Sequence, residues 1–175
     1  GQALLRAAES GAMVGTVAGV TSRTESTARA FLSTLRNPPP YLDRDSLIER
    51  ASLVVEMAGG HVFPELARDT FSSGKDLMVI SIGALLEYPE VIEQSRISGC
   101  RLLAPSGAIA GLDGIKSACA GVVDRVVMVS RKPPNALEEA PYLLERGISL
   151  AGLTQEKELF SGSARDACRG FPANL

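Results

Sequence analysis

Four turns of small or polar residues follow short apolar segments of this chain, at residues 21–23, 57–61, 81–84 and 104–108. Glycine and alanine let a backbone approach a flat ligand closely, because no large side chain intervenes. In open parallel sheets, ligands bind at the carboxyl ends of the strands. Four such turns in succession, each after a predicted strand, therefore favour a cleft for a dinucleotide cofactor.

Gly1 has the position of the last glycine in a phosphate-binding turn of the GxGxxG type. Residues 1–8 predict a helix with one apolar face, Gly11 is typical of a residue that ends a helix, and residues 13–20 predict a strand. In a dinucleotide-binding unit the ribose-recognising position follows that glycine by about 20 residues. Ser22 stands 21 residues after Gly1. The alternative is that the chain simply begins at a glycine.

Ser22 and Arg23 stand where an acidic residue would bind the ribose 2′-hydroxyl of NAD. A carboxylate repels a 2′-phosphate, whereas serine with arginine can bind one. Arg23 is equally typical of a solvated loop, so the choice between NAD and NADP as cofactor stays open.

The elements that would position these turns are marked by three apolar segments, 53–57, 77–81 and 101–104, whose starts are 24 residues apart. Near-continuous apolar segments are typical of strands buried on both faces of a sheet. Between them lie prolines suited to helix starts and glycines suited to helix ends (Pro64 with Gly74, then Pro89 with Gly99). We therefore predict an α/β fold with a Rossmann-type parallel sheet. Ser46 and Glu49 predict a capping box before the first of these strands.

The alternation of apolar segments and helix signals ends at Pro105. We expect an NAD(P)-binding Rossmann domain over residues 1–105, with its first strand missing, and an incomplete α+β catalytic domain over residues 106–175. The second part predicts a helix at 115–120 and strands at 122–130 and up to 159–160. Ser163 and Asp166 form a capping box for a further helix that ends at Gly170.

Composition narrows the function classes. The chain has 175 residues and a net charge of −2 without a basic cluster, which argues against a nucleic-acid partner. No apolar segment approaches the ~20 residues of a membrane span, and no signal-peptide pattern is present. Three dispersed cysteines indicate reduced thiols in a cytoplasmic protein, and a single histidine argues against a metal site. The lack of an initiator methionine and the stop at Leu175 lead us to expect a fragment.

Several motifs also carry a resemblance. Residues 81–85, 105–113 (PSGAIAGLD), 131–133 and 162–167 resemble, in order and spacing, the L-aspartate dehydrogenases, and 105–113 is the most specific of them. The resemblance implies a Rossmann domain followed by a catalytic and dimerising domain, and hence a homodimer or higher homo-oligomer. It implies oxidation of L-aspartate by NAD or NADP to iminoaspartate, which hydrolyses to oxaloacetate and ammonia, in nicotinamide cofactor biosynthesis.

The same resemblance assigns site residues. Ala108 is expected to contact the cofactor, and Ser81, Gly83 and Ala84 are expected beside the nicotinamide. The family's catalytic histidine is expected beyond Leu175, so we expect no catalytic residue within this chain and no activity from it alone. His61 could face the cleft, but a lone histidine is weak support for proton transfer, and a polar residue near a helix start is the favoured interpretation.

Ser163 and Arg165 begin a helix whose N–H groups could hold a substrate carboxylate. The plainer alternative for the pair is an N-cap serine with a surface arginine.

Two other functions remain open. One is a homoserine dehydrogenase-like or dihydrodipicolinate reductase-like oxidoreductase, which residues 105–113 disfavour. The other is a dinucleotide-binding module without enzymatic activity. A histidine on a strand downstream of this sequence would favour the enzyme.

Overall fold

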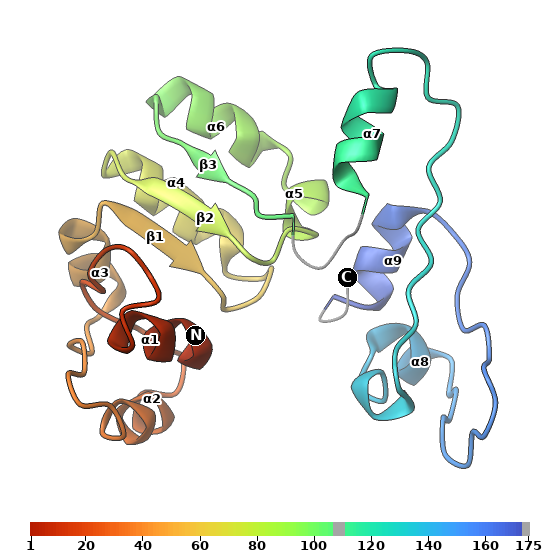
Figure 1. Cartoon of the computed structure of the whole chain (residues 1–175), viewed down its shortest axis with the longest axis horizontal. Coiled ribbons are helices and arrows are strands. Elements are labelled where there is room, and N and C mark those ends of the chain that lie inside the picture. The colour runs from red at the N-terminus through yellow and green to blue at the C-terminus, as the bar shows by residue number, and fades with distance from the viewer. Residues whose placement is uncertain (107–110, 173–175) are drawn as a thin grey trace. The chain divides into compact units, whose positions relative to one another are not determined.

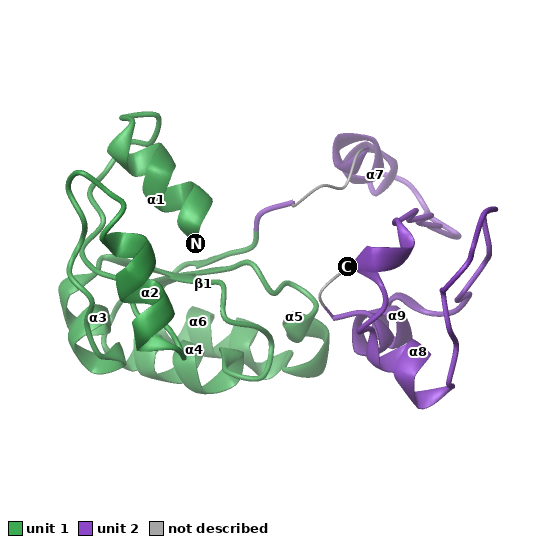
Figure 2. Ribbon diagram, turned by 90° about the horizontal axis from the view of Figure 1, so that it is seen from below, with its two compact units in different colours: residues 1–104 green, residues 105–175 purple. Residues whose placement is uncertain are grey.

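Three short parallel strands form the sheet in the computed structural model, which describes residues 1–106 and 111–172. They are β1 (Leu53–Glu56), β2 (Asp76–Val79) and β3 (Leu102–Leu103), and they lie side by side in chain order (Figure 1). The predicted apolar segments are therefore strands, and the predicted parallel α/β sheet is confirmed. This sheet belongs to the first of two compact units, residues 1–104, and the second unit comprises residues 105–175 (Figure 2).

Helices connect successive strands, as the proline and glycine positions predict. Between β1 and β2 lies α4 (Phe63–Ser72), with Pro64 in its first turn, and Gly74 follows it at a φ of +67°. Between β2 and β3 lie α5 (Ala84–Glu87) and α6 (Glu90–Ser98), and α6 is capped by Pro89 and Gly99. Figure 2 shows α4 and α6 on the same side of the sheet. The core of the unit is formed by buried apolar residues of β1, β2 and the helices around them (Ile48, Ala51, Val54, Phe63, Ala67, Phe71, Leu77, Val79, Ala84 and Val91).

The amino-terminal part contains α1 (Gln2–Glu9), α2 (Glu25–Leu32) and α3 (Arg44–Arg50). The strand expected at 13–20 is wrong in extent: only Val20 pairs, in an isolated parallel bridge with Tyr41. Its amide donates to Pro40 O at 3.0 Å, and its carbonyl accepts from Leu42 N at 2.9 Å. A strand needs a partner along its length, and the described residues supply one at this position alone.

The start of α3 also differs from the expectation. Asp43 rather than Ser46 is the N-cap residue, and its carboxylate accepts from Ser46 N at 2.9 Å and from Ser46 Oγ at 2.7 Å. A carboxylate is an effective acceptor at this position, so the helix begins at Arg44. These two bonds also lower the pKa of the Asp43 carboxyl below its ordinary value.

In the second unit, the described residues form α7 (Leu112–Ala118), a 3-10 turn (Pro134–Ala136), α8 (Pro141–Glu145) and α9 (Ala164–Gly170). Three aromatic rings, those of Tyr142, Phe160 and Phe171, pack with centroids 5.3–5.8 Å apart. They close a small apolar core around Leu143 and Leu150.

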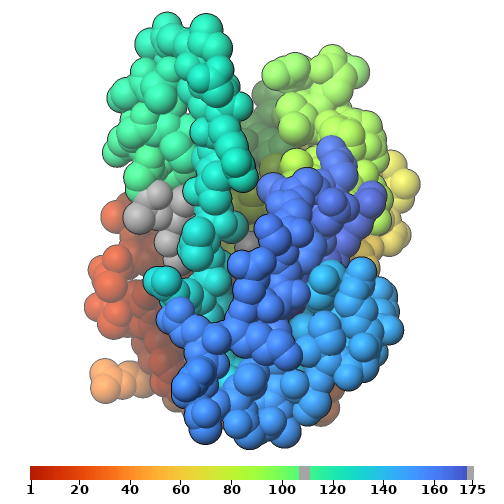
Figure 3. Space-filling model, turned by 90° about the vertical axis from the view of Figure 1, so that its right-hand side faces the viewer, coloured from red at the N-terminus to blue at the C-terminus, as the bar shows by residue number. Residues whose placement is uncertain are grey.

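The strands expected at 122–130 and 159–160 are not formed. Residues 122–130 run without regular structure along the face shown in Figure 3, and six of their apolar side chains are exposed (Val122, Val123, Val126, Val127, Met128 and Val129). The segment has a strand-forming composition, but no described residue pairs with its backbone. The helix predicted at 115–120 is present as α7, shifted three residues toward the amino end at its start.

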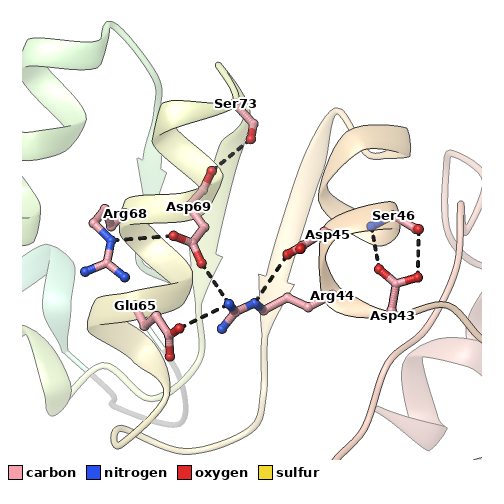
Figure 4. Close-up of polar contacts among 8 residues, drawn as sticks. All are labelled: Asp43, Arg44, Asp45, Ser46, Glu65, Arg68, Asp69 and Ser73. Atoms are coloured by element: carbon pink, nitrogen blue, oxygen red, sulfur yellow. Dashed lines mark hydrogen bonds and ion pairs between the residues drawn. The ribbon is translucent and has the colours of Figure 1, made fainter.

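Ion pairs join α3 to α4 (Figure 4). Arg44 Nη2 lies 3.1 Å from Glu65 Oε1 and 3.1 Å from Asp69 Oδ2. The hydrogen bond from Arg44 holds the pKa of Glu65 below its ordinary value. Because these side chains are largely at the surface, the cluster orients the two helices more than it stabilises them.

Two kinds of site are not seen in the described ranges. No helix there has both the length and the apolar character needed to cross a bilayer. Nor do His, Cys, Asp and Glu side chains gather there in a group that could hold a metal ion.

Candidate cofactor site

The carboxyl ends of β1 and β2 are paired neighbours, since Glu56 is in register with Val79. The turn after β1 (residues 57–61) and the turn after β2 (residues 80–83) therefore leave the sheet at the same edge. A Cβ on Gly60 would lie 3.3 Å from Ala84 Cβ, so the two turns are nearly in contact. Gly59 has a φ of +102°, which side chains other than glycine rarely allow. The glycines at this edge are thus required by its geometry.

Glu56 connects the two turns. The residue is only 1% exposed, and its Oε1 accepts from Ala58 N at 2.7 Å and from Gly59 N at 2.8 Å, both in the turn after β1. From the turn after β2, Ser81 Oγ donates to Oε1 at 3.1 Å and Ser81 N donates to Oε2 at 3.0 Å. One buried carboxylate thus fixes the position of both turns at the strand ends.

Glu56 is not among the residues that the sequence pattern predicts for the site. The signal available was a single carboxylate within the otherwise apolar segment 53–57, one residue before its end. An acid at a position predicted to be buried must have partners, and here it finds them in the neighbouring turns.

The structure brings together three of the expected cofactor residues. Ser81, Gly83 and Ala84 lie in one turn that leads directly from β2 into α5, with Ala84 N donating to Ser81 O at 2.9 Å. Ser81 and Gly83 are half-buried, whereas Ala84 is buried against the neighbouring turn. His61 is exposed in the turn after β1. Ala108 lies outside the described residues.

Ser22 and Arg23 form an exposed loop between the Val20 bridge and α2. Tyr41 Oη donates to Ser22 O at 2.9 Å and fixes the loop backbone. Gly1 is exposed at the start of α1, where its carbonyl accepts from Leu5 N at 3.1 Å. Nothing lies within 4 Å of a Cβ built on Gly1.

The two expected substrate residues lie in the second unit, at the start of α9. Ser163 Oγ donates to Asp166 Oδ2 at 2.6 Å and accepts from Asp166 N at 3.1 Å, so the predicted capping box is confirmed. Arg165 is exposed in the first turn of the helix. The plainer interpretation of Ser163, an N-cap, therefore describes its observed contacts.

Comparisons with known proteins agree with this architecture. The family model described as "Homoserine dehydrogenase, NAD binding domain" matches residues 1–105, and the one described as "Aspartate dehydrogenase, C-terminal" matches residues 113–175. A probable dehydrogenase from Thermotoga maritima shares the fold, with a TM-score of 0.52 and 15% identity over 67% of this chain and 37% of that one. The first unit is thus the NAD-binding domain of an oxidoreductase, and the expected nicotinamide dinucleotide cofactor is confirmed.

Curated relatives extend the match to nearly the whole chain. L-aspartate dehydrogenase 3 of Bordetella bronchiseptica is 41% identical over 91% of this chain and 58% of its own length. The L-aspartate dehydrogenases of Bradyrhizobium diazoefficiens and Methanosarcina mazei are 38% and 36% identical over 91% and 100% of this chain. This chain spans 57% and 66% of their respective lengths. The chain belongs to the L-aspartate dehydrogenase family, and the resemblance stated above is confirmed.

Proposed function

We propose that the whole protein is an NAD(P)-dependent L-aspartate dehydrogenase. In this proposal L-aspartate is oxidised to iminoaspartate, which hydrolyses to oxaloacetate and ammonia, and the reaction serves nicotinamide cofactor biosynthesis. The observation that carries the proposal is the match to relatives named L-aspartate dehydrogenase along both units of the chain. Residues 1–105 would bind the cofactor, and residues 106–175 would begin the catalytic and dimerising domain.

The residues at the carboxyl edge of the sheet fit a flat dinucleotide. Gly59, Gly60 and Gly83 let the backbone at this edge approach a ligand closely, and Glu56 holds the two turns in place. When bound, the nicotinamide supplies the hydride acceptor. The turn that contains Ser81, Gly83 and Ala84 would then form one wall of the nicotinamide pocket, and Ala108 is proposed as a further cofactor contact.

The other cofactor groups are assigned to the amino-terminal part. Gly1 begins α1, an eight-residue helix whose first N–H groups could donate to the pyrophosphate. The exposed Ser22 and Arg23 would meet the ribose 2′ position, where a guanidinium favours a phosphate over a hydroxyl. The proposed preference is therefore for NADP.

For the substrate, Arg165 would pair with a carboxylate of L-aspartate. Ser163 would contribute by starting α9 in the correct place, because its hydroxyl is already engaged with Asp166. L-Aspartate has two carboxylates, so a second cationic group is required for the same site.

A substrate comparison tests the proposal. The purified whole protein is given NAD or NADP with L-aspartate, L-homoserine or L-glutamate, and cofactor reduction is followed by absorbance. We expect the highest kcat/KM with L-aspartate. L-Homoserine is the sharpest competitor, because the family model of the first unit carries the homoserine dehydrogenase description. Greater turnover with L-homoserine or L-glutamate would overturn the substrate assignment.

A further inference from the structure

We infer that Glu56 is a positioning residue of the cofactor site, which holds the turns after β1 and β2 in their binding arrangement before the cofactor arrives. The inference rests on the proposed cofactor edge of the sheet. It adds a residue that makes no cofactor contact in the proposed function and acts through Ser81, Ala58 and Gly59.

Glu56 is buried at the carboxyl end of β1. A carboxylate that is 1% exposed loses nearly all of its hydration, which is costly unless other groups replace it. No ion pair of Glu56 is present among the described residues, so cations do not replace that hydration. Its partners are three backbone N–H groups and one hydroxyl, all in the two turns. The side chain therefore serves the turns rather than the strand in which it lies.

The two carboxylate oxygens of Glu56 accept different numbers of hydrogen bonds. Oε1 accepts from both turns, whereas Oε2 accepts from Ser81 N alone. A glutamine could keep the bonds to its single oxygen, but its amide nitrogen would then face the N–H of Ser81, and both groups are donors. Only a carboxylate of this length satisfies both turns together. The position of the Ser81 turn thus depends on the charge at Glu56.

The affinity for the cofactor depends on whether the two turns are ordered before it binds. A loop that must be ordered when its ligand arrives reduces affinity, whereas a loop ordered in advance does not. Because Ala58, Gly59 and Ser81 are already bonded to Glu56, the two turns are fixed without a ligand. The edge is therefore ordered before the cofactor arrives.

A pair of matched variants tests the inference in the whole protein. Glu56→Gln should raise the Kd for NADPH and NADH about tenfold or more, measured by cofactor fluorescence well below the melting temperature of each variant. Asp76→Asn is the control, because Asp76 also accepts a backbone N–H, that of Arg101 at 2.7 Å, and also links two strands. It does so at the opposite, amino end of the sheet. We expect its Kd values to stay within about twofold of those of the unaltered protein.

Amide hydrogen exchange provides a second measurement that needs no variant. The amides of Ala58, Gly59 and Ser81 should exchange slowly in the cofactor-free protein and change little when cofactor is added. Rapid exchange that slows only with cofactor would overturn the inference, even if Glu56→Gln failed to fold. Unchanged cofactor affinity in a folded Glu56→Gln variant would overturn it as well. Absence of NADH and NADPH binding by the unaltered protein would instead overturn the proposed function, and this inference with it.

Discussion

At the scale of single residues, the loop that holds Ser22 and Arg23 is the proposed site of discrimination between NAD and NADP. Both side chains are exposed, and Tyr41 fixes the backbone beneath them. The guanidinium of Arg23 is thus accessible to a ligand. A 2′-phosphate that reaches it gains a charge-assisted hydrogen bond, whereas a 2′-hydroxyl gains much less.

Replacing Arg23 by alanine should therefore raise the KM for NADP about tenfold and leave the KM for NAD within about twofold. Steady-state kinetics with each cofactor at saturating L-aspartate measure both values. Arg50→Ala is a suitable control, because Arg50 is an exposed arginine at the end of α3, before the amino end of β1. If the KM values for NAD and NADP rise equally in Arg23→Ala, the side chain contacts a group common to both, and the proposed preference is wrong.

At the scale of elements, the amino ends of β2 and β3 are joined by Asp76 and Arg101. Asp76 Oδ2 accepts from Arg101 Nη2 at 2.6 Å and from Nε at 2.9 Å, and Oδ1 accepts from Arg101 N at 2.7 Å. These bonds hold the pKa of Asp76 below its ordinary value of 3.8. A carboxyl group whose pKa is lower in the folded protein stabilises the fold above its unfolded pKa, and this stabilisation disappears as the pH falls through the folded value.

Asp76→Asn should therefore lower the melting temperature at neutral pH but have progressively less effect as the pH falls below about 4. Thermal unfolding of both proteins, followed by circular dichroism between about pH 2 and 7, measures the difference. The two curves should converge on the acid side. A difference that stays constant over the whole range would mean that the ion pair does not contribute through its charge.

The elements also show what a sequence can and cannot predict. β1, β2 and β3 and the helices between them follow from local signals, since Pro64, Gly74, Pro89 and Gly99 act on their own backbone. Residues 13–20 and 122–130 have equally strand-like compositions, but a strand forms only where a distant partner is available, and composition does not reveal the partner. Ser46 has the residue type of an N-cap, but Asp43, three residues earlier, accepts the N–H of Ser46 and so starts the helix before Ser46 is reached.

The candidate site likewise has a part that could be predicted from the sequence and a part that could not. The position of the turn with Ser81, Gly83 and Ala84 at the carboxyl end of β2 could be predicted, because small residues follow a buried apolar segment there. The role of Glu56 could not be predicted, because its partners in the turn after β2 lie 25 residues away in the chain. Only the register of β1 with β2 brings them together.

At the scale of the whole molecule, the exposed apolar segment at 122–130 affects behaviour in solution. Val127 and Val129 are 64% and 76% exposed, and no described residue pairs with the backbone around them. Exposed apolar side chains on an unpaired extended backbone favour association with another chain. The 175-residue chain should therefore associate as its concentration increases.

Changing Val127 and Val129 together to threonine should reduce this association and leave the melting temperature nearly unchanged, since neither side chain is buried. Light scattering over a concentration series measures the effect. Leu144→Thr is the matched control, because Leu144 is 65% exposed but lies on α8, where the helix satisfies the backbone. Equal scattering from the double variant and the unaltered chain would show that the segment does not mediate association.

The strand order of the sheet has a consequence for how the first unit folds. Each strand pairs with the one that precedes it in the chain, as Leu53 does with Asp76 and Leu77 with Leu102. Each new pairing therefore closes only the loop between two successive strands. The entropy of loop closure is lost in two separate steps, one for each pairing, and not in one larger step. Pairing with a strand further along the chain would close a longer loop at a higher entropic cost. The β1–α4–β2 segment can thus pair its strands during synthesis before β3 has been made.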